Sequence, residues 1–172
     1  MEIITKFTVA TEEGVKLLLT LTEALALEKF ASLVAPATLK NYIAQNFNKE
    51  ALVAELNSMS NQWLMVYVDG IPAGYARITS KGTKPKVVEG HSAMRIADFA
   101  VLKAYAQKGV EQALLMKCLT VCRSYQRIWI HEQQDSALVA LFEENGFSRL
   151  AEEMPLDNLP LKAAFFIREH QV

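Results

Sequence analysis

Apolar residues recur along the chain with two different periods and divide it into strands and helices. Ile3–Val9 mixes apolar residues with threonines and predicts a short strand. Thr11 precedes two glutamates, as an N-cap residue often does, and leucines at helical spacing then predict a helix to about Val34. Pro36 is expected to end that helix, because a proline disfavours helical backbone in the residue before it. A second helix, broken near its middle, is expected over Thr38–Asn57.

Three consecutive strands are predicted in the middle of the chain. Gln62–Val68 is apolar on both faces, which indicates a strand at or near the centre of a sheet. Asp69-Gly70 is a strong signal for a two-residue hairpin turn and leads into a second strand, Pro72–Thr79. Ser80–His91 is basic and has no hydrophobic period, so we expect a loop. The third strand is Ser92–Leu102.

Helices and strands alternate in the C-terminal half. The expected elements are a helix from about Lys108 to Tyr125, a strand Arg127–Ile130, a helix capped by Asp135 or Ser136 and ended by Gly146, and strands Phe147–Leu150 and Ala163–Arg168. The order β-α-α-β-β-β-α-β-α-β-β predicts an α/β (mixed α+β) fold, a central mixed sheet with helices on both faces. Residues 1–172 are expected to form one domain.

The composition describes a globular protein and argues against two classes of partner. Hydrophobic residues are 51% and charged residues 22% of the chain, so disorder is not expected. The net charge of −1, from 18 basic and 19 acidic residues, gives no electrostatic reason to expect nucleic acid or an anionic membrane. The apolar stretch Val15–Val34 carries four charged residues and is not expected to span a bilayer.

Cysteine usage and the N-terminal sequence favour a cytoplasmic protein. Cys118 and Cys122 lie four residues apart in a predicted helix, and we interpret them as small buried apolar residues rather than as half of a metal site. Two cysteines give no disulfide framework, which fits a reducing compartment. The first residues do not resemble a signal peptide.

One strand–turn–helix segment stands out chemically. The strand Arg95–Leu102 runs into a turn that contains Gly109, and a long amphipathic helix follows directly. This arrangement presents backbone N–H groups at a helix N-terminus, where an anion such as a phosphate binds well.

Three stretches of sequence resemble the GNAT superfamily of N-acetyltransferases. Ala100–Leu115 is similar to the family's strand-turn-helix with its Gln/Arg-x-x-Gly-x-Gly/Ala signature. Ile128–Ile130 and then Ala137–Phe147 resemble the family segment that ends in Asn-Gly-Phe. Asn41–Leu56 resembles the small-amine, polyamine-type acetyltransferases of bacteria.

The resemblance implies that acetyl-CoA is the cosubstrate and that it lies between two diverging strands. Backbone at residues 99–101 would bond the pantetheine arm and the acetyl oxygen, and amides at residues 107–112 would hold the pyrophosphate. Asp135 stands where relatives often have an asparagine that bonds the cofactor, although a helix N-cap is the alternative. The implied cofactor-binding residues are Phe99, Ala100, Val101, Gln107, Lys108, Gly109, Val110, Glu111, Gln112 and Asp135.

Three positions depart from the family pattern. Ala106 replaces the first Gln/Arg of the phosphate motif, and Glu111 replaces its last Gly/Ala. A carboxylate there would repel phosphates by roughly 1 kcal/mol or more per close pair, although an acid in a first helical turn also favours the helix dipole. Phe142 stands where many relatives have the tyrosine that protonates the thiolate.

Two residues are the expected catalytic candidates, Asp98 as general base and His131. Asp98 lies among apolar neighbours in a predicted buried strand, where a carboxylate needs a partner or a raised pKa. The alternative for Asp98 is a position on a sheet edge or an ion pair with Arg95. His131 and its neighbour Glu132 could instead be a solvated strand end, and His91 is a further candidate base.

The sequence thus predicts acetyl transfer to a small amine or a peptide amine by direct attack. The alternative is a GNAT-fold protein without catalysis, which binds acyl-CoA or a partner; Glu111, Ala106 and Phe142 motivate it. No acceptor is named by any motif, and specificity is expected in the first two helices and the Ser80–His91 loop. The resemblance also allows a homodimer.

Overall fold

The computed structural model describes residues 1–106 and 109–170. Its helices and strands, in chain order, are β1 Ile3–Thr8, α1 Glu12–Phe30, α2 Pro36–Asn46, α3 Lys49–Leu56, β2 Asn61–Val68, β3 Ile71–Thr79, the 3-10 helix η1 Lys86–Val88, β4 Ala93–Val101, α4 Val110–Val121, β5 Arg127–Gln133, α5 Leu138–Glu144, β6 Ser148–Pro155 and β7 Lys162–Glu169.

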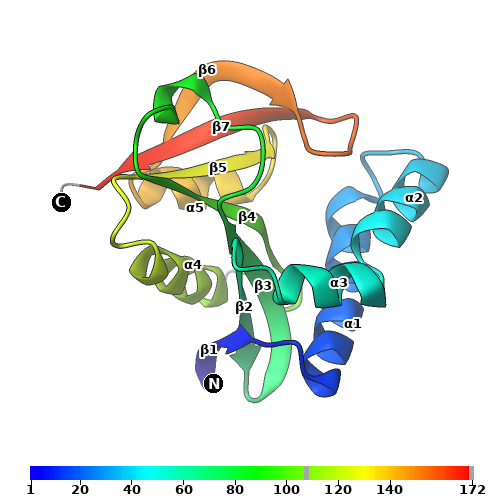
Figure 1. Ribbon diagram of the computed structural model, residues 1–172. Helices are drawn as coiled ribbons and strands as arrows, with labels where there is room; N and C mark the ends of the chain where they lie inside the picture. Colours follow the sequence, from blue (N-terminus) through cyan, green and yellow to red (C-terminus); the bar gives the residue numbers. More distant parts are fainter. Residues whose placement is uncertain (107–108, 171–172) are drawn as a thin grey trace.

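The seven strands form one mixed sheet in the order β1-β2-β3-β4-β5-β7-β6 (Figure 1). Neighbouring strands are antiparallel except β4 and β5, which are parallel. The crossover between those two parallel strands runs through α4, as such connections require. Asp69 and Gly70, both at positive φ, form the turn between β2 and β3, so the predicted hairpin is confirmed.

Helices cover both faces of the sheet, as the sequence predicted. α1, α2 and α3 pack on one face, and α4 and α5 pack on the other (Figure 1). Successive residues of β2 point to opposite faces: Trp63 and Met65 belong to the first layer, Leu64 and Val66 to the second. Cys118 and Cys122 are buried in the second layer as free thiols.

Helix boundaries near the N-terminus differ from the expectation. α1 ends at Phe30 rather than near Val34, and Pro36 begins α2 instead of closing α1. Proline suits the first helical position, because its missing N–H has no intrahelical acceptor there and its fixed φ is already helical. Asn48 caps α3 by accepting a hydrogen bond from Ala51 N at 2.8 Å, which explains the break in the second predicted helix.

The C-terminal strands are longer than predicted, and this changes the environment of two candidate residues. β5 continues through His131 and Glu132, which are 7% and 3% exposed, so the prediction of a solvated strand end is wrong. Phe165 of β7 stacks on His131 at a centroid distance of 4.3 Å, and Glu132 pairs with Lys29 of α1 at 2.9 Å. Neither predicted residue is the N-cap of α5: that position is Ala137, while Ser136 Oγ accepts from Leu138 N and Asp135 is exposed.

No helix in the described part of the chain combines the length and apolarity that crossing a bilayer requires.

Candidate functional site

β4 and β5 separate soon after they begin. Their ladder joins residues 93–95 of β4 to residues 127–129 of β5, whereas β4 continues to Val101. On its other edge β4 stays paired with β3, through Tyr75 opposite Ala100 and Gly74 opposite Val101. The C-terminal part of β4 therefore keeps one edge free of sheet hydrogen bonds, next to the opening between the two strands.

A bulge in β4 lies at Asp98. Arg77 is opposite Ala97 while Tyr75 is opposite Ala100, so β4 carries one residue more than β3 over this interval. Asp98 has a φ of 55°, in the left-handed region that aspartate tolerates better than most residues. The bulge turns its side chain away from the regular alternation of the strand.

Asp98 pairs with Arg77 and not with Arg95, so the sequence-based alternative named the wrong partner. Arg77 Nε donates to Asp98 Oδ2 at 2.9 Å. Burial raises the pKa of Asp98, but the charges of Arg77 and Arg95 and the hydrogen bond from Arg77 outweigh it, so the pKa lies below its ordinary value. The carboxylate is ionised near neutral pH.

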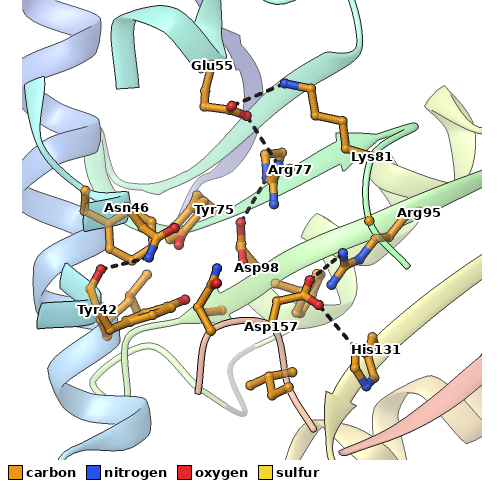
Figure 2. A pocket seen from close by; sticks show the side chains of 18 of the residues that line it. Tyr42, Asn46, Glu55, Tyr75, Arg77, Lys81, Arg95, Asp98, His131 and Asp157 are labelled. Atoms are coloured by element: carbon orange, nitrogen blue, oxygen red, sulfur yellow. Dashed lines mark hydrogen bonds and ion pairs between the residues drawn. The ribbon is translucent and has the colours of Figure 1, made fainter. Parts of the chain in front are cut away.

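A cavity of about 560 Å³ contains Asp98 and opens between α1–α3, the strands β3–β5 and the β6–β7 loop. Figure 2 shows Tyr42 and Tyr75 on one side of it, Arg95 and His131 on the other, and Asp98 between them. Phe99, Ala100 and His131 also line the cavity, so it brings together both catalytic candidates and part of the predicted cofactor backbone. We call it the acceptor pocket.

Aromatic side chains make up one side of the acceptor pocket. Trp63 and Tyr75 stack with ring centroids 5.8 Å apart, and Tyr42 meets Phe30 and Phe47 edge-on at 5.9 and 5.7 Å. Burial, followed by the charge of Asp98, raises the pKa of both tyrosines, which remain neutral hydroxyl groups.

His131 lies on β5 at the opposite side of the pocket. Its Nε2 is 3.1 Å from Met154 O, and a carbonyl only accepts, so this nitrogen carries the proton. Nδ1 is then the free acceptor, 3.9 Å from Asp157 Oδ1 (Figure 2). Burial lowers the pKa of His131 below its ordinary value, so the ring is neutral near pH 7.

Lys29 of α1 bridges the diverging strands. Its Nζ donates to Glu132 Oε2 on β5 at 2.9 Å and to Phe99 O on β4 at 3.2 Å. The preceding residue, Glu28, accepts a hydrogen bond from Lys103 N at 2.9 Å. The C-terminal turn of α1 is thus attached to both edges of the β4–β5 opening.

The N-terminus of α4 has features both for and against phosphate binding. Gly109 is the N-cap, in a left-handed conformation at φ 79°, and a Cβ at this position would meet no heavy atom within 4 Å. Val110 is fully buried, Glu111 lies in the first turn, and Gln112 exchanges hydrogen bonds with Asn145 at 2.8 and 3.0 Å. Gln107 and Lys108 lie outside the described residues.

Two further residues singled out from the sequence lie away from the acceptor pocket. Phe142 is fully buried in the opposite layer, in contact with Phe99, Phe147 and Phe166 at centroid distances of 5.6 to 6.2 Å. Asp135 is exposed before α5 and is not among the residues that line the pocket.

Sequence reasoning missed most of the polar side chains that surround Asp98 and His131. Arg77, Glu55, Lys29 and Asp157 were not identified as site residues, although each has an ionic contact in the pocket. Charged residues inside otherwise apolar segments, such as Arg77 in β3 and Lys29 near the end of α1, were the available signal.

The seven-stranded mixed sheet with helices on both faces and an opening between β4 and β5 is the fold of acyl-CoA N-acyltransferases. The comparisons with known proteins agree. The family model described as the acetyltransferase (GNAT) family matches residues 19–147. The chain belongs to the GNAT acetyltransferase family.

Several solved structures share the fold at low sequence identity. PaiA N-acetyltransferase from Thermoplasma acidophilum, in complex with coenzyme A, has a TM-score of 0.77 at 11% identity, covering 99% of this chain and 100% of that one. The ribosomal-protein-S18-alanine N-acetyltransferase from Escherichia coli has a TM-score of 0.64 at 12% identity, with 96% and 94% covered. A GNAT-family acetyltransferase from Streptococcus pneumoniae has 0.64 at 16% identity, with 98% and 100% covered.

Acetyl-CoA is the cosubstrate that this family membership supports, and the residues present fit it. The opening between β4 and β5 leaves one backbone edge of β4 without a strand partner, and a Cβ at Gly109 would meet no heavy atom within 4 Å. Glu111 is the one feature among the described residues of α4's first turn that opposes an anion by its charge.

Proposed function

We propose that this protein is an N-acetyltransferase that transfers acetyl from acetyl-CoA to a small primary amine bound in the acceptor pocket. The observation that carries the proposal is a neutral, buried histidine at the wall of a polar cavity that adjoins the β4–β5 opening. The size of the cavity, about 560 Å³, suits a small molecule.

The backbone at Phe99, Ala100 and Val101 would hold the acetyl end of the cosubstrate, and the first turn of α4, from Gly109 to Gln112, would hold its phosphates. We retain Gln107, Lys108 and Asp135 as expected contacts on the sequence resemblance alone. Acetyl-CoA supplies an activated thioester, and the acceptor must reach it as a neutral amine by direct attack.

His131 Nδ1 is our choice for the group that receives the amine proton. Its other nitrogen is held by Met154 O, which fixes the ring and leaves Nδ1 as the acceptor. A proton on Nδ1 would lie beside the Asp157 carboxylate, which favours the charged ring. Met154 O and Asp157 together can therefore bond both nitrogens of the protonated ring.

Asp98 is better suited to a positioning role than to the base role expected from the sequence. Its lowered pKa makes it a weaker base, and its Oδ2 already accepts from Arg77. Its charge fixes Arg77, whose guanidinium also reaches Glu55 at 3.4 Å. We therefore expect Asp98→Asn to lower the rate less than His131→Gln does.

The first test is the melting temperature with and without millimolar acetyl-CoA. A ligand at about 100 times its Kd stabilises the folded state by roughly 2.7 kcal/mol, which raises the Tm by several degrees for a chain of this size. An unchanged Tm would contradict the proposal. A raised Tm without release of CoA thiol across an amine panel would point to acyl-CoA binding without turnover.

The second test compares His131→Gln with His91→Gln. We expect the His131 variant to lose about 10²–10⁴-fold in kcat with acetyl-CoA binding retained. His91 is exposed and outside the pocket lining, so its variant should keep the wild-type rate. Equal rates in both variants would remove His131 from the mechanism. A thiol reagent suits this assay, since both cysteines of the protein are buried.

A further inference from the structure

The ionic side chains of the acceptor pocket are balanced in number and paired with one another. Four acidic and four basic side chains line it, and each acid contacts at least one base. The pairs are Lys29–Glu132 at 2.9 Å, Arg77–Asp98 at 2.9 Å, Arg77–Glu55 at 3.4 Å, Lys81–Glu55 at 3.3 Å and Arg95–Asp157 at 2.7 Å.

This balance does not favour a polycation as the acceptor. A polyamine would need carboxylates that are not already neutralised, and each carboxylate of the lining has a cationic partner. Binding a chain of ammonium groups would therefore require breaking those pairs or bringing like charges together. The polyamine-type likeness in Asn41–Leu56 is not matched by the charges of the pocket.

Arg95 is a pocket cation with a buried N–H donor that has no acceptor among the described residues. It is 5% exposed, and its Nη1 forms an ion pair with Asp157 Oδ2. Its Nε is a buried donor with no acceptor among the described residues, as is Trp63 Nε1 on the aromatic side. A guanidinium carries five N–H groups in a fixed fork that matches a carboxylate.

The position of Arg95 is fixed by its surroundings. The guanidinium lies over the ring of Trp129, 5.0 Å from its centroid. Gly82, on the Ser80–His91 loop, lies close to the guanidinium at Arg95 Nη1. Its partner Asp157 belongs to the short loop between β6 and β7 and is 43% exposed, so that partner is the less constrained member of the pair.

Asp157 lies between Arg95 and His131 and contacts both. One oxygen of that carboxylate contacts Arg95 and the other faces His131 Nδ1 (Figure 2). One carboxylate group therefore spans the distance between Arg95 Nη1 and His131 Nδ1. An amine next to His131 and a carboxylate next to Arg95 would fit one molecule in which a single carbon joins them.

We propose that the acceptor is an α-amino acid with an apolar or aromatic side chain, whose carboxylate binds Arg95. The inference rests on the proposed function, because the same pocket must present the amine to His131. The side chain of the amino acid would lie against Tyr42, Trp63 and Tyr75. This assignment provides an oxygen acceptor for the unpaired Nε–H of Arg95, which a polyamine does not.

The experiment measures binding for pairs of ligands that differ only in the carboxylate. The pairs are L-phenylalanine with 2-phenylethylamine, L-tyrosine with tyramine, L-leucine with 3-methylbutylamine and L-lysine with 1,5-diaminopentane, and spermidine is measured beside them. Titration calorimetry is done with the full chain, alone and at saturating coenzyme A. We expect at least one acid to bind about tenfold or more tightly than its amine, the range of a charge-assisted hydrogen bond.

Two variants assign that preference to Arg95. Arg95→Lys keeps the charge but loses the fork, and it should reduce the preference for the acid by about tenfold. Asp157→Asn removes the competing carboxylate while keeping its shape, and it should tighten binding of the acid, an effect that misfolding cannot produce. Arg149→Lys is the matched control, since Arg149 lies on β6 outside the pocket lining. It should change neither the Kd of the acid nor the Kd of the matching amine.

Three results would overturn the proposal: no acid binds more tightly than its amine, spermidine binds more tightly than every acid, or Arg95→Lys leaves the preference unchanged. The proposed function fails separately, by an absent effect of acetyl-CoA on the Tm. Arg95-dependent binding of an acid without that effect would retain the ligand class and reject the reaction.

Discussion

A charged carboxylate with almost no exposed surface needs a compensating partner, and the partner of Glu132 is Lys29. The side chain of Glu132 is 4% exposed and that of Lys29 is 22% exposed, so the two partners are not equally buried. The loss of either partner should therefore have unequal consequences. Glu132 without Lys29 would be a buried charge with no cation in contact, whereas Lys29 without Glu132 has access to solvent.

This asymmetry predicts the result of a double-mutant cycle. Lys29→Met should lower the free energy of unfolding by about 3–5 kcal/mol, as expected when a buried pair loses one partner. Glu132→Gln should cost clearly less, because the amide is neutral and still accepts hydrogen bonds. Urea denaturation of the two single variants and the double variant gives the coupling energy.

The matched control is Lys81→Met, which removes a half-exposed cation of the same pocket. It should change the free energy of unfolding by less than about 1 kcal/mol, as surface pairs do. Two results would contradict the predicted asymmetry of the Lys29–Glu132 pair. One is a loss of unfolding free energy in Lys29→Met as small as in Lys81→Met, and the other is a double variant no more stable than Lys29→Met.

At the scale of elements, the N-terminus of α4 combines a favourable geometry with an unfavourable charge. The Gly109 cap and the helix dipole favour an anion, whereas Glu111 in the first turn repels one. Glu111→Gln keeps the size of the side chain and removes the charge. We expect it to tighten acetyl-CoA binding by about fivefold, the equivalent of roughly 1 kcal/mol.

Glu50→Gln provides the control for that prediction. Glu50 is also a first-turn helix acid, in α3, and it is exposed and outside the pocket lining. Both variants should lose a similar small amount of helix-dipole stabilisation, about 0.3–1 kcal/mol. Isothermal titration with acetyl-CoA separates the cases, because only the Glu111 variant should gain affinity. Equal affinities in wild type and both variants would show that Glu111 does not oppose the cofactor.

The elements were predictable because their signals are local, whereas the pocket is formed by pairs distant in sequence. The Asp69-Gly70 turn and the helical spacing of leucines in α1 depend on neighbouring residues only. Lys29 and Glu132, by contrast, are 103 residues apart. Asp98 was found as a charge within an apolar strand, but its partner depended on the register between β3 and β4.

The environment of His131 also depends on residues that are distant in sequence. The sequence suggested a solvated strand end, because polar residues follow the apolar Ile128–Ile130. Phe165 of β7 stacks on the ring of His131 at a centroid distance of 4.3 Å, and this contact cannot be predicted from the sequence of β5 alone. The charge state of this residue is therefore a property of the assembled sheet.

At the scale of the whole molecule, the neutral His131 ring links folding to pH. Its pKa is below the ordinary value of 6.5 in the folded chain, mainly because of burial, so the unfolded chain binds the proton more readily. The contribution of His131 to stability is thus fully present above about pH 6.5. It is lost as the pH falls through the lowered folded pKa, with a slope of at most about 1.4 kcal/mol per pH unit.

Urea denaturation between pH 8 and about pH 5 tests this link for the entire fold. The free energy of unfolding of the wild type should decline below about pH 6.5, and His131→Gln should decline less because its amide does not titrate. His91→Gln serves as the control, since His91 is exposed, and it should follow the wild-type curve. Asp98, with its lowered pKa, loses its contribution only at more acidic pH and does not interfere in this window. Parallel curves for wild type and His131→Gln would mean that this ring is not held neutral by the fold, and they would also remove the physical basis for its role as proton acceptor.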